Sequence, residues 1–403
     1  MGAPFRGGRP VAARPSVSFD REDATTMWRI CLLVLLWCWS GLGLAAGRPV
    51  PAPPELGARA YGLMDFDSGR YIVARNIDQR VEPASITKLM TAYVVYKALA
   101  DGSIGLDDMV TVSEKAWKAE GSRMFIEVGK QVSVRDLLHG LVIQSGNDAA
   151  IALAEHVAGS EDSFVSLMNQ EAQRLGMKDT HFVNAEGLPD PEHYTTVRDI
   201  MTLTRALIRE FPEHYALYKE KTFTYNKIKQ SNRNRLLWQD PSVDGVKTGH
   251  TQSAGYCLVA SARRNGMRLI SAVFGTRNDD ERTDQSRALL NYGFRFFETR
   301  KLYPAGEALA QLTVWKGAAD TVPLGVREDI YITFPKGRYQ DLDATMDRPR
   351  WLEAPVAEGQ KVGLLTIALD GEVLRQAPLV ALEAVDEAGL VGRLIDSVRM
   401  LWQ

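Results

Sequence analysis

Cysteine is scarce in this chain, with three residues among 403. Cys31 and Cys38 lie in an apolar N-terminal run, so Cys257 is the one cysteine beyond it. A single thiol cannot form an intramolecular disulfide, which excludes a fold stapled by disulfides. Because Cys257 lies between Tyr256 and Leu258 in a strand-like run, we expect a small buried hydrophobic residue there and not a nucleophile.

The chain also lacks an excess of charge of either sign. Its 48 lysine and arginine residues nearly balance 50 aspartate and glutamate residues, for a net charge of -2. A nucleic-acid-binding surface usually shows a basic excess, so we expect no nucleic-acid partner. The six histidines show no His-Glu-x-x-His or similar spacing, so no metal and no cofactor is predicted, and His181 and His193 are expected to be structural.

One apolar run stands out near the N-terminus, Ile30 to Leu44, and it is shorter than a typical membrane-spanning helix. Arg29 precedes the run, and two small residues, Ala45 and Ala46, follow it. This arrangement is typical of a secretory signal peptide, so we predict a signal region over residues 1–46 and export of the protein. An uncleaved anchor is the alternative.

The segment before that run is acidic for a signal peptide, since it contains Asp20, Glu22 and Asp23. A translation start at Met27 would remove this discrepancy. The segment after the run, residues 47–57, is rich in proline, and we expect an extended leader there.

The composition predicts a globular protein with room for two domains, since 45% of the residues are hydrophobic and 24% are charged. Two segments alternate like β-hairpins, around Asp67-Ser68-Gly69 and around Asn265-Gly266, and Asn-Gly favours a tight turn with positive φ. Helical patterns occur at Ala84–Ala100, Val134–Leu141, Ala149–Val157, Ser163–Leu175, Val197–Glu210 and Arg282–Glu298. We therefore predict an α/β (α+β) domain over residues 58–297, with a mainly antiparallel sheet flanked by helices.

The pattern changes after this domain. From Leu312 to Val385, short alternating runs separated by turn residues predict a small all-β domain over residues 298–385. In residues 386–403, apolar side chains recur at helical spacing, at Leu390, Val391, Leu394, Ile395, Val398, Leu401 and Trp402. We expect an amphipathic helix that binds a membrane surface, and docking of this helix on its own protein is the alternative.

The stretch EPASITKLMTAYVVYKAL, Glu82 to Leu99, is predicted to form a buried helix with a lysine near its start. Ser85 and Lys88 are three residues apart, so on a helix they share a face within hydrogen-bond reach. Apolar residues on several sides indicate burial, which disfavours the charged amine and lowers the lysine pKa. Lys88 could then take the proton of Ser85, and N–H groups at the helix start would favour developing negative charge.

Two further motifs follow along the chain. Ser145-Gly146-Asn147 lies between an apolar segment and a helix, where it can present a hydroxyl and an amide to a cleft. Lys247-Thr248-Gly249 precedes the second hairpin, where alternation places the lysine and the glycine on one face of a strand and the glycine lets a ligand approach. Taken alone, each motif is also consistent with a purely structural role. The first could be an N-cap with its turn, and the second an exposed lysine on an edge strand. Together with Ser85 and Lys88 they predict serine acyl transfer.

This order of motifs resembles the active-site serine penicillin-recognising enzymes, which include penicillin-binding proteins and serine β-lactamases. Longer stretches resemble the low-molecular-weight D-alanyl-D-alanine carboxypeptidases, namely VDGVKTGHTQSAGYCLVASARRNGMRLISAVFG, HFVNAEGLPDPEHYTTVRDI and LLNYGFRFFE. The resemblance covers Leu56 to Phe297 closely, and the β-rich segment and terminal helix are similar to that subgroup as well. It implies a β-lactamase/transpeptidase-like catalytic domain.

The resemblance implies a role for each motif residue. Ser85 is the expected nucleophile, Lys88 its general base, and Ser145 a proton shuttle towards the leaving amine. Residues expected to bind substrate are Asn147, Lys247, Thr248, Gly249, His250 and Arg282. Asn147 would hold the substrate amide, the lysine and threonine of the third motif would bind the terminal carboxylate, and Arg282 is a weaker candidate for that task. The backbone N–H groups of Ser85 and His250 would form the oxyanion hole.

The implied reaction removes the terminal D-alanine from peptidoglycan stem pentapeptides, and β-lactam antibiotics would acylate the same serine as covalent inhibitors. The implied setting is cell-wall remodelling and cell shape, at the periplasmic face of the bacterial inner membrane, with the C-terminal helix on the membrane surface. A D,D-endopeptidase, a β-lactamase and a non-catalytic wall-binding module are the alternatives.

Overall fold

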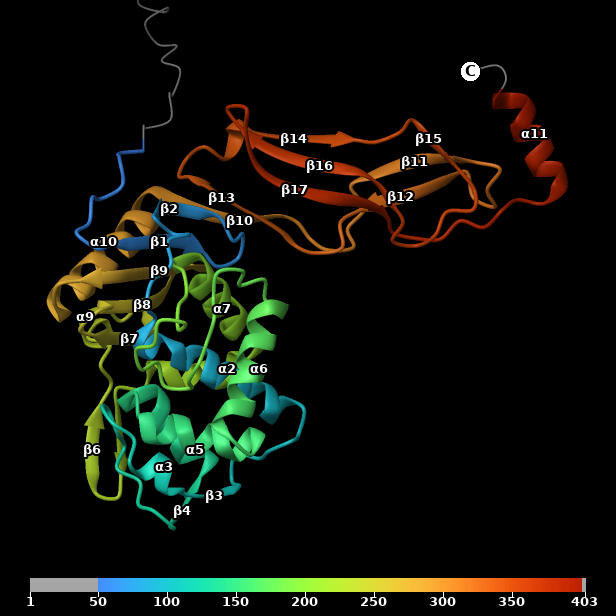
Figure 1. Cartoon of the computed structure of the whole chain (residues 1–403). Coiled ribbons are helices and arrows are strands. Elements are labelled where there is room, and N and C mark those ends of the chain that lie inside the picture. The colour runs from blue at the N-terminus through green and yellow to red at the C-terminus, as the bar shows by residue number, and fades with distance from the viewer. Residues whose placement is uncertain (1–49, 401–403) are drawn as a thin grey trace, which may run out of the picture. The chain divides into compact units, whose positions relative to one another are not determined.

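The structure, a computed structural model, describes residues 50–400, with the side chain of Met400 left out (Figure 1). The predicted signal region, residues 1–46, lies outside this part of the chain, as does the start of the proline-rich leader. Residues 50–57 form no helix or strand. Among the helices within residues 50–400, none has the length and hydropathy needed to cross a membrane.

The centre of the first domain is a five-stranded sheet with the order β2-β1-β9-β8-β7, in which every neighbouring pair is antiparallel. Its strands are β1 (Ala60–Asp65), β2 (Tyr71–Arg75), β7 (Val243–Thr251), β8 (Gly255–Arg264) and β9 (Met267–Thr276). Both predicted hairpins are present, and Asn265 and Gly266 have the positive φ angles, 49° and 86°, that their tight turn requires. The prediction of a mainly antiparallel sheet is therefore confirmed.

Helices cover both faces of this sheet (Figure 1). The helices of this domain are α2 (Lys88–Ala100), α3 (Glu114–Trp117), α4 (Val134–His139), α5 (Asn147–Ala158), α6 (Glu161–Arg174), α7 (Val197–Glu210), α8 (Pro212–Tyr215), α9 (Leu236–Gln239) and α10 (Asp279–Phe296). Leu289 and Leu290 of α10 pack with Leu258 and Leu269 on one face. Helices α2, α5 and α7 share the larger core on the other face, which explains why the central strands are buried on both sides.

Two small two-stranded sheets complete the first domain. Strands β3 (Met109–Thr111) and β4 (Gln131–Ser133) pair with each other, as do β5 (Thr222–Tyr225) and β6 (Ile228–Ser231).

Two predicted helices differ from those observed. The helix expected from Ala84 begins as a 3-10 turn, Ala84–Thr87, and becomes α-helical only at Lys88. The helix expected over residues 134–141 ends at His139, and a wider π turn, Gly140–Gln144, carries the chain to Ser145. One irregular turn contains Ser85 and the other ends next to Ser145, so the departures from ideal helix geometry set the direction of these side chains.

The C-terminal region is built from strands, as predicted. Strand β10 (Phe297–Tyr303) pairs with β13 (Ile330–Pro335), and a six-stranded sheet has the order β14-β16-β17-β12-β11-β15. These strands are β11 (Ala310–Trp315), β12 (Thr321–Gly325), β14 (Leu342–Asp347), β15 (Trp351–Glu353), β16 (Lys361–Leu369) and β17 (Glu372–Ala381). Helix α11 (Leu390–Met400) follows, which confirms the predicted terminal helix.

Candidate active site

Ser85 and Lys88 are in hydrogen-bond contact. Ser85 lies in the 3-10 turn that precedes α2, and Lys88 opens that helix. Lys88 Nζ lies 3.1 Å from Ser85 Oγ, and the lysine is only 1% exposed because α2 is packed on nearly all sides. The sequence prediction of a buried amine next to this hydroxyl is thus matched by the geometry.

The surroundings of Lys88 prepare its amine to accept a proton. Nζ has two shorter contacts, at 2.7 Å to Asn147 Oδ1 and at 2.6 Å to the backbone carbonyl of Glu186. Burial, aided by the positive charge of Arg233 and opposed by the negative charge of Glu186, lowers the pKa of Lys88 to about 7. A free amine has two N–H donors, which the two short contacts use, so its lone pair is left to face Ser85 Oγ.

Ser145 and Lys247 form the second contact pair. Ser145 ends the π turn with a φ of 66°, in the left-handed region. Lys247 Nζ donates to Ser145 Oγ at 2.8 Å and to the Thr248 carbonyl at 2.9 Å. Although β7 is an edge strand, Lys247 is 3% exposed, so it is not a solvated lysine. Burial lowers its pKa well below the usual value, and the positive charge of Lys88 acts in the same direction.

Asn147 holds the amine of the first pair. It begins α5 and accepts from Lys88 through Oδ1, while its Nδ2 donates to the Glu120 carbonyl at 2.6 Å. A carboxamide held at both ends has a fixed orientation, which leaves its second N–H available to a bound group. A side chain at Gly121 would come within 3.0 Å of Nδ2, so the neighbouring loop approaches the amide closely.

The other residues of the third motif lie along β7. Thr248 is 5% exposed, and a Cβ at Gly249 would lie 3.0 Å from the Pro83 carbonyl. Glycine therefore lets the strand pack against the turn that carries the serine. His250 is exposed, and its ring lies 4.0 Å from that of Tyr256.

Arg282 lies in α10 behind the strand. It is 7% exposed, and its Nη1 donates to the carbonyls of Gly249 at 3.1 Å and Cys257 at 3.3 Å. Its Nε donates to Asp279 Oδ1 at 2.7 Å. Through these contacts Arg282 connects β7 with β8. Burial is the main cause of the lowered pKa of Lys247, and the positive charge of Arg282 adds to this effect. Direct contact with a substrate carboxylate stays a prediction.

Two residues near the motifs had no role in the sequence analysis. Arg233 donates from Nη2 to Ser122 Oγ at 2.8 Å, and its charge affects both lysines of the site. Glu186 supplies the carbonyl that accepts from Lys88, across 98 positions of sequence. The stretch NAEGL contains Glu186, but no spacing rule connects it to the serine. Cys257 is buried and free, as expected.

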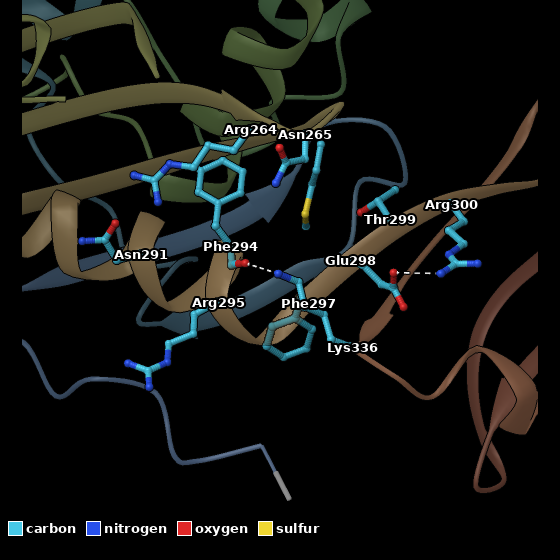
Figure 2. A pocket seen from close by; sticks show the side chains of 11 residues that line it. Arg264, Asn265, Asn291, Phe294, Arg295, Phe297, Glu298, Thr299, Arg300 and Lys336 are labelled. Atoms are coloured by element: carbon cyan, nitrogen blue, oxygen red, sulfur yellow. Dashed lines mark hydrogen bonds and ion pairs between the residues drawn. The ribbon is translucent and has the colours of Figure 1, made fainter. Parts of the chain in front are cut away.

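A cavity of about 770 Å³ lies elsewhere, and no motif residue lines it. Figure 2 shows its lining residues, which are Arg264, Asn265, Met267, Asn291, Phe294, Arg295, Phe297, Glu298, Thr299, Arg300 and Lys336. Lys336 Nζ donates to the Phe294 carbonyl at 2.6 Å, Arg300 pairs with Glu298 at 3.1 Å, and Arg264 lies over the Phe294 ring. Because these cations are engaged by the chain itself, we assign no chemistry to this cavity. Within residues 50–400, no cluster of His, Cys, Asp and Glu is suited to a metal ion.

Comparison with known proteins agrees with this geometry. The peptidase S11 D-alanyl-D-alanine carboxypeptidase family matches residues 48–278, and the penicillin-binding protein 5 C-terminal domain matches residues 297–387. The D-alanyl-D-alanine carboxypeptidase DacA of Escherichia coli is 44% identical over 361 residues, which cover 88% of this chain and 90% of that protein.

Solved structures give the same result. Penicillin-binding protein 5 of Haemophilus influenzae has a TM-score of 0.82 at 45% identity, over 84% of this chain and 100% of that chain. Penicillin-binding protein D2 of Listeria monocytogenes in an ampicillin-bound form has a TM-score of 0.56 at 31% identity, over 60% of this chain and 100% of that chain. The chain therefore belongs to the D-alanyl-D-alanine carboxypeptidase family of serine peptidases, peptidase S11.

Proposed function

We propose that this protein is a serine-type carboxypeptidase that removes the terminal D-alanine from peptidoglycan pentapeptides through an acyl-enzyme on Ser85. The observation that carries the proposal is the buried amine of Lys88, 3.1 Å from Ser85 Oγ, with a pKa lowered by burial to about 7. A serine hydroxyl is a poor nucleophile at neutral pH, so it needs such a base.

In acylation, the Ser85 hydroxyl proton passes to Lys88 as Oγ bonds to the carbonyl carbon of the penultimate D-alanine. The backbone N–H groups of Ser85 and His250 stabilise the oxyanion. The tetrahedral intermediate then loses its C–N bond, and the proton taken up by Lys88 passes through Ser145 to the leaving amine, which returns Lys88 to the free base. The free D-alanine departs, and an ester joins the remaining peptide to the serine.

In deacylation, water attacks the ester carbonyl and gives a proton to Lys88. The C–Oγ bond breaks, Ser85 recovers its proton, and the shortened peptide leaves. The same base serves both halves because each begins with the removal of a proton from a hydroxyl or from water.

Recognition of a free carboxylate is assigned to Lys247 with Thr248. The site is cationic, since Arg233 and Arg282 lie close enough to Lys247 for their charges to lower its pKa, after the larger effect of burial. A terminal carboxylate entering this field would favour the ammonium form of Lys247, whose pKa burial otherwise lowers. Substrate binding and charging of Lys247 are therefore coupled in this proposal.

β-Lactam antibiotics are expected to acylate Ser85 by opening of their ring. A protein of similar structure, penicillin-binding protein D2 of Listeria monocytogenes, has been solved in an ampicillin-bound form, which supports this expectation. Ring opening replaces the loss of D-alanine with a leaving group that stays attached. Slow attack by water on that ester would make the antibiotic an inhibitor.

We also propose that α11 binds a membrane surface, which would place an exported enzyme at the periplasmic face of the inner membrane and in cell-wall remodelling. Its apolar side chains are exposed, with 80% exposure for Leu390 and 70% for Leu394. Its polar side is tied to the β-rich region, where Asp396 accepts from the Lys316 backbone N–H at 2.9 Å. The apolar side is therefore left for another surface, as in interfacial helices.

The activity is tested by incubating the full chain with a muropeptide pentapeptide and measuring free D-alanine. We expect release by the wild type and none by Ser85→Ala, with Ser166→Ala, an exposed serine of α6, as the matched control. No release by the wild type, or equal release by Ser85→Ala, would refute the proposal. Cleavage of cross-linked muropeptides in preference to pentapeptides would indicate an endopeptidase instead.

The membrane proposal is tested by sedimentation with anionic lipid vesicles. Leu394→Asp is expected to abolish cosedimentation without changing D-alanine release. Retained binding by this variant would exclude the apolar side of α11 as the contact.

A further inference from the structure

A pair of buried carboxyl groups lies beside the catalytic lysine, and the roles proposed above leave it unused. Glu161 and Glu186 are each 6% exposed. The backbone of Glu186 contacts Lys88 directly, since its carbonyl accepts from Nζ at 2.6 Å. An ionised Glu186 side chain raises the pKa of Lys88, after the larger, opposite effect of burial.

Glu161 is placed as an ionised carboxylate. It is the first residue of α6, where free N–H groups and the helix dipole favour negative charge. Oε1 accepts from the Ala185 N–H at 2.9 Å, and Oε2 pairs with Lys115 Nζ at 2.7 Å. Burial raises the pKa of Glu161, but hydrogen bonds with Glu186 and Lys115 outweigh burial and hold it below its usual value.

Glu186 is placed as a protonated acid. Its side chain is hydrogen-bonded to Glu161, and two ionised carboxylates have no hydrogen to share, so this bond requires a proton. Its Oε2 is buried and accepts no hydrogen bond from any residue within the described range 50–400, an arrangement that is costly for an anion. Burial first, then the bond to Glu161 and its charge, raise the pKa of Glu186 to about 8.

We propose that Lys88 and Glu186 share one proton, and that Glu161 keeps this proton on Glu186 so that Lys88 rests as the free amine. The step is a transfer within the pair, in which an ammonium and a carboxylate become an amine and a carboxylic acid with no change in net charge. Glu161 and Glu186 are positioning residues in this scheme, because they act through the lysine. The inference rests on the role of Lys88 as the general base in the proposed function.

The other charged or titratable groups around the pair are Asp148 of α5, Lys115 of α3, Arg233 in the loop before α9, His193 in the loop before α7 and Lys247 of β7. Lys247 is itself a base and donates to Ser145 Oγ and the Thr248 carbonyl. Asp148 accepts from the backbone N–H groups of Met124 and Phe125, at 3.0 and 2.9 Å. Burial lowers the pKa of His193 to about 4, so it is neutral near pH 7. Glu186 is thus the group in this set that can exchange a proton with Lys88 near neutral pH.

The test measures the pH dependence of acylation by a chromogenic β-lactam for three variants. Glu161→Gln removes the carboxylate that keeps the proton on Glu186. Glu186 then ionises at lower pH and raises the pKa of Lys88. The acid limb of the profile, where the acylation rate falls as the pH decreases, therefore moves to higher pH. A shift of one unit means about a tenfold loss of rate on that limb. Glu186→Gln mimics the protonated acid and keeps the wild-type limb. The double variant also returns to the wild-type limb, because no carboxylate remains beside the lysine. Glu192→Gln, an exposed residue before His193, is the matched control.

Three outcomes overturn the inference. A downward shift of the limb in Glu186→Gln would mean that Glu186 is charged at rest, and a double variant as slow as Glu161→Gln would mean that the first effect is structural. Infrared spectra give a readout that does not depend on activity: the wild type is expected to show a protonated-carboxyl band that disappears near pH 8 and is absent from Glu186→Gln. Absence of this band from the wild type overturns the inference. If the band is present but no D-alanine is released, the proton assignment is supported and the proposed function fails.

Discussion

The domain that ends at Phe297 and the β-rich region after it are both packed around apolar cores, but they differ in the polar groups that they bury. The first domain encloses Lys88, Lys247 and Glu186, each with at most 6% exposure. In the described residues after 297, Thr333 is the one buried polar side chain. Burial of ionisable groups costs free energy, so buried ionisable groups gathered in one domain indicate that the functional site lies in that domain.

The two regions should therefore respond differently to the same kind of substitution. In the first domain, a small change near the motif residues should reduce activity out of proportion to stability. In the β-rich region, a large change to the core should reduce stability and leave activity intact.

The largest effect is expected for Lys88→Met, which removes the base and keeps a side chain of similar length. We expect a loss of kcat/KM of about a thousandfold or more, since a general base and its nucleophile act as a unit. Lys130→Met, at an exposed lysine, is the control and should retain full activity. A Lys88→Met enzyme with rates near those of the wild type would remove Lys88 from the mechanism.

In the β-rich region, Leu365→Ala empties a fully buried position of β16. Truncation of a buried leucine lowers the free energy of unfolding by about 2 to 5 kcal/mol. Denaturant titration, monitored by a signal from the β-rich region, measures this loss of stability. D-alanine release from a soluble pentapeptide should stay at the wild-type rate under native conditions. A parallel loss of activity would show that the catalytic site depends on the β-rich core.

Two glycines with positive φ make a matched pair across the regions. Gly187 has a φ of 88°, and a Cβ there would lie 1.9 Å from the Ala84 carbonyl, beside the serine. Gly371 has a φ of 82° and no neighbour within 4 Å. We expect Gly187→Ala to lower kcat about a hundredfold by displacing the turn that carries Ser85. Gly371→Ala should cost about 1 kcal/mol of stability and no activity. Equal effects on kcat would contradict the contrast.

The smallest effect is the response of the unmodified protein to pH. Because burial lowers the pKa of Lys88 to about 7, the base is increasingly protonated below that pH. The rate of acylation should therefore fall about tenfold for each unit by which the pH lies below the pKa of Lys88. The melting temperature of the β-rich region should hardly change over the same range. A rate independent of pH between 6 and 8 would contradict the lowered pKa of the lysine.

Much of the fold could be predicted because local patterns determine it. Helix α7 has the predicted bounds, since Thr196 caps its start and apolar residues recur at helical spacing. The hairpin at Asn265-Gly266 follows from the conformational freedom of those two residues. The 3-10 turn at Ser85 and the π turn before Ser145 could not be predicted, because neighbouring segments hold them in place.

The proximity of the motif residues could be predicted from the sequence, while their chemical roles stay predictions. Ser85, Lys88, Ser145 and Lys247 were found from spacing and order, and the structure brings them into two contact pairs. The contacts of Glu186 depend on a loop that is far away in sequence, so no periodicity could reveal them.

The central claim is that Ser85 is the nucleophile, and mass spectrometry of the protein incubated with penicillin tests it most directly. We predict one adduct with the mass of the antibiotic, located by peptide mapping on Ser85 and absent from Ser85→Ala. An adduct on any other residue, or a wild-type protein that forms none, would contradict this account.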